Sequence, residues 1–291
     1  MADLAKTNTF KIVGTLVDLD SKTGQMKNGQ DYISATATIN STIDGKSYQY
    51  EVEFFSSKVT KDGKASQLYI NYSKLGEMLN KKVEVTGELR ENRFWSAKTS
   101  QMASSIALSG KFVKGVGSDS QDCADFEVVG FIATGLTEKT KKDNNEVYRY
   151  DLVIGIANYT DTKVSLFTLN VEPENVAVVK GTQQYNVGQT VKLGGKLRFT
   201  VEKVTKEEEN AFGAPTIKTY TNKTKNFFIV SGSNPITEEG AFYTQEKIKG
   251  LIEAYKADDA EKAAAAKNNA SATEQPAESK PAVTSRQQSL I

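Results

Sequence analysis

The stretch that decides the fold is Lys82-Val83-Glu84-Val85-Thr86-Gly87-Glu88-Leu89-Arg90. Its apolar residues alternate with polar ones, which is the two-residue period of a half-buried β-strand. The pattern returns 108 positions later as Thr190-Val191-Lys192-Leu193-Gly194-Gly195-Lys196-Leu197-Arg198. The sequence therefore predicts the same strand twice.

Two further strands repeat in the same order. Phe10-Lys11-Ile12-Val13-Gly14 returns as Phe126-Glu127-Val128-Val129-Gly130. Glu51-Val52-Glu53-Phe54-Phe55 resembles Lys163-Val164-Ser165-Leu166-Phe167. Three matches in one order indicate a duplicated unit, and loops of different length explain the small changes in spacing.

Each unit is predicted to contain three strands, a helix and two more strands. The first unit has candidate strands at 10–19, 32–39, 48–55, 82–90 and 94–98, a helix within 66–80, and a final turn at Glu91-Asn92. The second has candidate strands at 126–135, 147–157, 163–171, 190–201 and 217–230, and a short helix at 173–180. This is the element order of the OB-fold, a five-stranded Greek-key barrel that binds oligonucleotides or oligosaccharides.

The predicted fold class is mainly β, with two tandem OB-fold barrels, a C-terminal helix and a disordered tail. The expected domains are a first barrel at 1–114, a Gly-, Ser- and Asp-rich linker at 115–125 and a second barrel at 126–236. A helix is expected at 237–267, with an apolar stripe of Phe242, Ile248, Leu251, Ile252 and Tyr255. The composition of 268–291 cannot bury enough apolar area to fold.

Composition excludes several kinds of chemistry. The 291 residues contain no histidine and one cysteine, Cys123, so neither a histidine-based nucleophile pair nor an intramolecular disulfide can form. We expect no enzymatic activity, no bound metal and no cofactor, although carboxylate-based chemistry with magnesium stays possible in principle. The chain shows no secretory signal and no apolar run long enough to span a bilayer, so we expect a soluble cytoplasmic protein.

Charge is weakly informative about the partner. The formal net charge is +1, but residues 1–117 carry 16 basic against 12 acidic side chains, whereas residues 118–236 carry 14 against 15. A mild basic bias in the first unit is compatible with binding to a polyanion through that unit. Aromatic side chains can add sequence-tolerant binding energy, because bases stack on them.

The candidate binding residues are therefore aromatics outside the expected core, together with nearby cations. Phe55 ends the polar face of the third strand, and Phe167 holds the matching place in the second unit. The alternative that both pack beneath a neighbouring loop stays open. Further candidates for nucleic-acid binding are Tyr32, Arg90, Arg93, Phe94, Trp95, Lys98, Tyr148, Arg149 and Arg198. Because adjacent strand residues face opposite sides, one of Phe94 and Trp95 is expected to be exposed.

The sequence resembles the bacterial and phage single-stranded DNA-binding protein family in the order of four features. These are the apolar strand Tyr50–Ser56, the following helix, the strand Lys82–Arg90 and the pair Phe94-Trp95. The resemblance is clearest over 48–98. It implies that Phe55 and Phe167 are base-stacking residues and that Phe94 takes the place of the family's hairpin tryptophan.

Two departures from this pattern affect the expected site. Gln49 stands where the family usually has another stacking tryptophan, and Glu202 stands at the hairpin aromatic position of the second unit. Binding by the first barrel is therefore expected to dominate.

The resemblance also suggests partners besides single-stranded DNA. The last residues, Ser289, Leu290 and Ile291, form an apolar end after a flexible stretch and are a candidate hook for replication or recombination proteins. Homo-oligomerisation is a further possibility. The leading hypothesis is sequence-independent binding of single-stranded DNA in replication, recombination or repair. A tandem-barrel adaptor that binds proteins only, and an RNA-binding protein, remain as alternatives.

Overall fold

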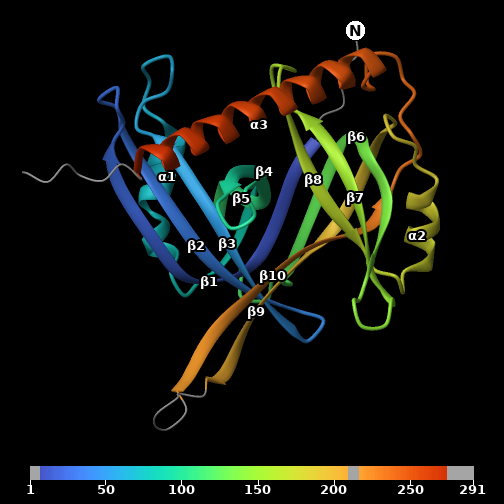
Figure 1. Cartoon of the computed structure of the whole chain (residues 1–291). Helices are drawn as coiled ribbons and strands as arrows, with labels where there is room; N and C mark the ends of the chain where they lie inside the picture. Colours follow the sequence, from blue (N-terminus) through green and yellow to red (C-terminus); the bar gives the residue numbers. More distant parts are fainter. Residues whose placement is uncertain (1–6, 209–215, 274–291) are drawn as a thin grey trace, which may run out of the picture.

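The computed structural model describes residues 7–208 and 216–273, and its arrangement is shown in Figure 1. The first half contains five strands: β1 (Thr7–Gln25), β2 (Asp31–Ile43), β3 (Lys46–Ser57), β4 (Lys82–Ser96) and β5 (Gln101–Gly115). The helix α1 (Gln67–Ser73) and the 3-10 turn η1 (Leu75–Met78) lie between β3 and β4. The strands close in the order β1-β2-β3-β5-β4-β1, and β3 and β5 form the parallel pair. This closed five-stranded order confirms the OB-fold.

The second half repeats this topology. Its strands are β6 (Cys123–Thr140), β7 (Val147–Ala157), β8 (Val164–Val171), β9 (Thr190–Glu208) and β10 (Thr216–Gly232). The helix α2 (Val176–Gln183) separates β8 from β9. The strands close as β6-β7-β8-β10-β9-β6, again with one parallel pair, between β8 and β10. Beyond the second barrel, β9 and β10 continue as a long two-stranded arm (Figure 1).

Local sequence explains the first hairpin. The alternating residues Ile33, Ala35, Ala37 and Ile39 of β2 are all buried, as their spacing predicts. Asp44 and Gly45 both have positive φ, 52° and 73°, which is the backbone of a tight hairpin turn whose twist matches the flanking strands. The turn and the burial pattern together set the pairing of β2 with β3.

The last hairpin of the first barrel differs from the prediction. The expected turn at Glu91-Asn92 is wrong, because β4 continues to Ser96 and β5 starts only at Gln101. Pairing runs without a break from Arg90↔Ala107 to Ser96↔Gln101. The polar residues after Arg90 resemble a turn in sequence, but one side of this ribbon packs against the rest of the protein, which keeps it extended.

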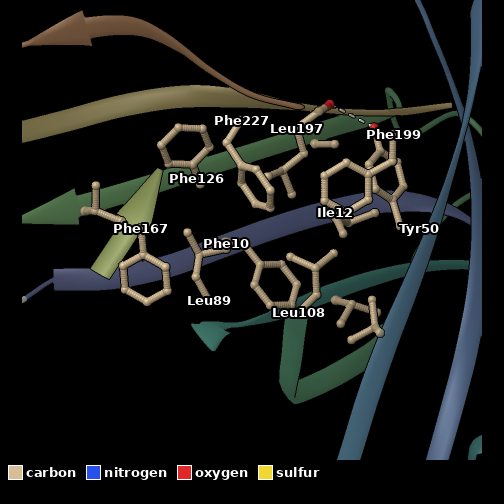
Figure 2. Packing of buried hydrophobic residues seen from close by; sticks show 14 of the residues in the cluster. Phe10, Ile12, Tyr50, Leu89, Leu108, Phe126, Phe167, Leu197, Phe199 and Phe227 are labelled. Carbon is tan, nitrogen blue, oxygen red and sulfur yellow. Dashed lines mark hydrogen bonds between the residues drawn. The ribbon is translucent and has the colours of Figure 1, made fainter. Parts of the chain in front are cut away.

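The two barrels are joined by pairing and by a shared core. β1 pairs antiparallel with β6 from Thr7↔Val129 to Val13↔Cys123, so β6 begins inside the segment 115–125 that was expected to be a linker. One hydrophobic cluster contains buried residues of both barrels (Figure 2). In Figure 2 the Tyr50 hydroxyl of β3 donates to the carbonyl oxygen of Leu197 in β9, at 3.0 Å. Burial raises the pKa of the Tyr50 phenol, which keeps it a neutral donor.

The C-terminal helix α3 (Gln245–Thr273) lies across both barrels (Figure 1). It begins eight residues after the expected start at Thr237, because the preceding segment is held on the second barrel: the Tyr243 amide donates to Thr190 Oγ1 at 2.8 Å. The expected apolar stripe is partly confirmed, since Ile248 and Leu251 are buried in a second cluster with Tyr243. The helix continues past the expected end at Lys267, and residues 274–291 lie outside the described part of the chain.

Candidate nucleic-acid interface

An aromatic pair, of which Phe55 is exposed and Tyr32 is half-buried, lies on the outer face of β2 and β3. The rings of Tyr32 and Phe55 stack with centroids 5.5 Å apart and planes inclined by 29°. Phe55 is 56% exposed, although it is a large apolar side chain. It pairs with Ser34 across the ladder, and the residues before it on the same face are Glu53 and Glu51. The pair therefore forms an apolar platform on an otherwise polar surface, which is suited to stacking a base.

A cation lies beside this platform. Arg90 of β4 forms an ion pair with Glu53, two residues before Phe55 on the same face of β3. Its Nε also donates to Asn92 Oδ1 at 3.0 Å. The Arg90 and Glu53 side chains are 48% and 42% exposed, so their pairing contributes little to stability. A phosphate can therefore compete for the guanidinium at small cost.

Phe94 lies on the same side of β4 as Arg90. Arg90, Asn92 and Phe94 alternate along the strand and so point to one side, and Phe94 is 50% exposed. Trp95 points to the opposite side, where the ammonium of Lys267 lies 5.4 Å from its ring centroid. Of the two adjacent aromatics, Phe94 is thus the exposed one. Lys98 is exposed in the turn that joins β4 to β5.

Arg93 does not join this surface. Its guanidinium forms ion pairs with Asp258 and with Asp259 (2.7 Å) of α3, and it lies 4.1 Å from the centroid of the Tyr255 ring. The side chain is only 13% exposed. The expectation that Arg93 holds a phosphate is therefore corrected: two aspartates already occupy its donors.

Glu91 completes this contact between the first barrel, α3 and the second barrel. Its carboxylate accepts a hydrogen bond from the Tyr255 hydroxyl at 2.6 Å and another from the Leu166 amide at 2.9 Å. Burial raises the pKa of Glu91, although both hydrogen bonds oppose that shift. The inward side of the β4–β5 ribbon thus serves assembly, which leaves only its outward side for a ligand.

The prediction for Phe167 is wrong. It is fully buried, with 0% exposure, and pairs with Ile154 in the core of the second barrel. Its buried position corresponds to that of Phe54 and not to that of Phe55, a shift of one residue that turns a strand side chain to the other face. The neighbour Leu166 packs against the cluster beneath α3, so β8 carries apolar residues on both faces. The alternation of polar and apolar residues in the sequence of β8 therefore could not predict which of its faces is exposed.

The remaining candidates of the second barrel have mixed surroundings. Arg198 lies at the seam, with its guanidinium 5.0 Å from the Tyr48 ring centroid and 3.7 Å from Asp44, and is largely covered. Tyr148 is 48% exposed, with the Arg149 guanidinium 5.6 Å from its ring centroid. Arg149 also pairs with Asp151 at 2.8 Å.

Arg149 nevertheless faces the first barrel. It lines a cavity of about 280 Å³ together with Ser104 and Ser105 of β5. Ser105 pairs with Asn92, which lies on the outward side of β4. The structure therefore places Arg90 beside the Tyr32–Phe55 pair, with Phe94 farther along the same side of β4. Arg149 lies in a separate pocket, next to β5.

Sequence reasoning missed Tyr159, which is 96% exposed in the loop between β7 and β8. No strand pattern marks it, because it lies in a polar turn. The proposed tail hook, Ser289, Leu290 and Ile291, lies outside the described residues. Over the described ranges, no group of three or more Cys, Asp or Glu side chains could hold a metal ion, and no helix is long and apolar enough to cross a membrane.

The closed barrels and their exposed aromatic and cationic surface define a tandem OB-fold protein. A sequence model of the YorF family matches residues 6–270, and the chain belongs to that family. No curated protein matches the sequence.

Solved structures that share the fold include two of a single protein. They are the wild-type single-stranded DNA binding protein from Thermus aquaticus and a deletion mutant of the same protein. Each is 10% identical to this chain, with a TM-score of 0.50, and the match covers 83% of this chain and 98% of theirs. At this identity the likeness establishes a common fold.

Proposed function

We propose that this protein binds single-stranded DNA without sequence preference, chiefly through its first barrel, and thereby protects it during replication, recombination or repair. The observation that carries the proposal is the Tyr32–Phe55 stack with its exposed Phe55 ring. Arg90 lies beside it, and Phe94 lies farther along the same side of β4. The fold shared with single-stranded DNA binding proteins supports it. A bacterial or phage setting follows from the sequence resemblance alone.

The arrangement fits a single strand better than a duplex. A flat ring offers stacking to an unpaired base, whereas duplex bases are already stacked on one another. Few free cations surround the platform, since Arg90 is paired with Glu53 and Lys58 with Asp31 at 3.1 Å. Stacking, more than a dense positive field, therefore supplies the affinity, and the near-neutral charge of the protein is compatible with binding.

The test is equilibrium binding of labelled oligothymidine to the full chain at several salt concentrations. Phe55→Ala is expected to weaken binding about 5- to 150-fold, the equivalent of one lost stacking contact of about 1–3 kcal/mol. Val187→Ala is the control, because Val187 is 63% exposed in the loop between α2 and β9 of the second barrel, outside the proposed surface. Absence of binding by the wild type at low salt would refute the proposal.

The same assay separates the two alternatives. Competition between oligothymidine and oligouridine of equal length measures the preference for DNA, and tighter binding of the RNA would favour an RNA-binding protein. A protein adaptor predicts no binding to either oligomer.

A further inference from the structure

A groove that includes Arg90 lies between the two barrels. It encloses about 680 Å³ and is bounded by β1, β4 and β5 on one side and by the ends of β7 and β8 on the other. Arg90, Lys111 and Ser109 line it from the first barrel. Asn158, Tyr159 and Ser165 line it from the second. The walls therefore combine two cations and the Glu88 carboxylate with hydroxyl groups and apolar side chains. Two aromatic residues also line the groove, Tyr159 and Phe167, and of these Phe167 is buried.

Arg90 connects the groove to the Tyr32–Phe55 platform. Arg90 belongs to both, because it pairs with Glu53 next to Phe55 and also lines the groove. Lys111 is the second cation there, and its ammonium lies 3.5 Å from Glu88 between side chains that are 43% and 53% exposed. Exposed pairs of this kind exchange their partner for a phosphate at small cost. Two replaceable cations thus mark a path for a sugar-phosphate backbone that leaves the platform.

Tyr159 stands at the far end of this path. It is 96% exposed, so almost nothing in the protein covers its ring. Its loop is nevertheless held by internal hydrogen bonds. Asn158 Oδ1 accepts hydrogen bonds from the backbone amides of Thr162 (2.9 Å) and Lys163 (3.0 Å). The Lys247 ammonium of α3 also binds Asp161 of this loop at 2.7 Å. The loop therefore presents an uncovered ring from an ordered turn, so little backbone entropy is lost when a ligand binds there.

From these observations we infer that the inter-barrel groove carries a single strand from the first barrel to the second, and that Tyr159 stacks on a base there. This inference rests on the proposed function and extends it by naming a second contact site. Tyr159, rather than the buried Phe167, is then the stacking aromatic of the second barrel. Arg90 and Lys111 contact the intervening phosphates.

Oligomer length provides the test. One barrel of this fold occupies about 4–16 nucleotides, so an oligothymidine of about 6 nucleotides can fill the first-barrel surface alone, whereas one of about 30 can also reach Tyr159. Tyr159→Ala is expected to weaken binding of the long oligomer about 5- to 150-fold and to leave the short one unchanged. Tyr159→Phe keeps the ring and is expected to bind both lengths as the wild type does.

A spectroscopic variant locates the contact directly. Trp95 is the only tryptophan, so the double variant Trp95→Phe/Tyr159→Trp reports from the loop alone. Its fluorescence is expected to be quenched by the long oligomer and unaffected by the short one. Wild-type affinity of Tyr159→Ala for the long oligomer, or no quenching in the double variant when it binds, would overturn the inference but leave the proposed function standing. Failure of the wild type to bind either length would overturn both.

Discussion

Phe10 and Phe126, which occupy equivalent places in the two sequence repeats, face each other directly across the antiparallel pair of β1 and β6. The register around them is symmetric, because Thr9 pairs with Glu127 and Lys11 with Asp125. The duplicated barrels are thus related by an approximate two-fold axis that passes between these two rings. Both side chains are at most 3% exposed and belong to the core that the barrels share.

This shared core predicts that the two barrels unfold together. Phe126→Ala is expected to lower the free energy of unfolding by about 3–5 kcal/mol and to destabilise both barrels, because the ring packs at their junction. Urea denaturation followed by Trp95 fluorescence, which reports on the first barrel, and by circular dichroism, which reports on both, should give coincident transitions. Two separated transitions would show instead that the barrels are independent units.

Gly87 and Gly195 are each expected to be intolerant of a side chain. A Cβ at Gly87 would meet the Ser109 carbonyl oxygen and the Phe10 ring, and one at Gly195 would meet the Phe126 ring. Alanine at either position is expected to cost about 1–3 kcal/mol of stability through overpacking. Thermal unfolding measures the effect, and Gly135→Ala is the control because that position has open space. Equal stability of all three variants would contradict the packing argument.

The Arg90–Glu53 pair predicts opposite effects on DNA binding. Arg90→Gln should weaken binding and reduce the slope of log K against log salt by about 0.7, the value for one phosphate contact on a single strand. Glu53→Gln should strengthen binding about two- to fivefold, because it frees Arg90 and removes a negative charge beside Phe55. Titrations with oligothymidine at several salt concentrations measure both. If the salt dependence of binding were unchanged in Arg90→Gln, Arg90 would not be a phosphate contact.

Arg93 is expected to behave differently from Arg90, although only two residues separate them. Arg93→Gln should lower the free energy of unfolding by about 1.5–3 kcal/mol, because it removes charged hydrogen bonds to Asp258 and Asp259. The salt dependence of DNA binding should stay that of the wild type. Denaturation and binding are measured on the same preparation. A reduced salt slope would show that Arg93 leaves α3 to contact phosphate.

Glu84 makes stability depend on pH. Hydrogen bonds from Lys114 (2.8 Å) and Lys11 (2.9 Å) hold the pKa of its carboxyl below the usual 4.5. As the pH falls, the unfolded chain takes up this proton first, so the stabilisation is complete above pH 4.5 and disappears as the pH falls through the lower folded-state pKa. Glu84→Gln should therefore cost about 1 kcal/mol at pH 7 and nothing in strong acid.

Chemical denaturation at both pH values measures this difference between Glu84→Gln and the wild type. Glu77→Gln is the control, because Glu77 is exposed on η1. If the difference in free energy of unfolding between the wild type and Glu84→Gln did not change with pH, the proposed link between Glu84 protonation and stability would be ruled out.

Sequence periodicity determined much of the architecture. The three repeated strands predicted two barrels. The alternation from Ile33 to Ile39 predicted the buried face of β2, because successive side chains of a strand point to opposite faces. The Asp44-Gly45 turn followed from residues that accept positive φ. The exposed Phe55 could also be found, since it interrupts a polar face.

Tertiary structure alone decided the rest. Arg93 binds Asp258 and Asp259, which lie more than 160 positions later in the sequence. No local sequence pattern predicts such a contact. Phe167 differs from its repeat partner Phe55 because a one-residue shift in strand register reverses the face of a side chain. The groove that joins Arg90 to Tyr159 exists only where two barrels, paired through β1 and β6, lie side by side. Sequence spacing therefore determined the barrels, whereas packing between distant segments decided which of their residues remain available to a ligand.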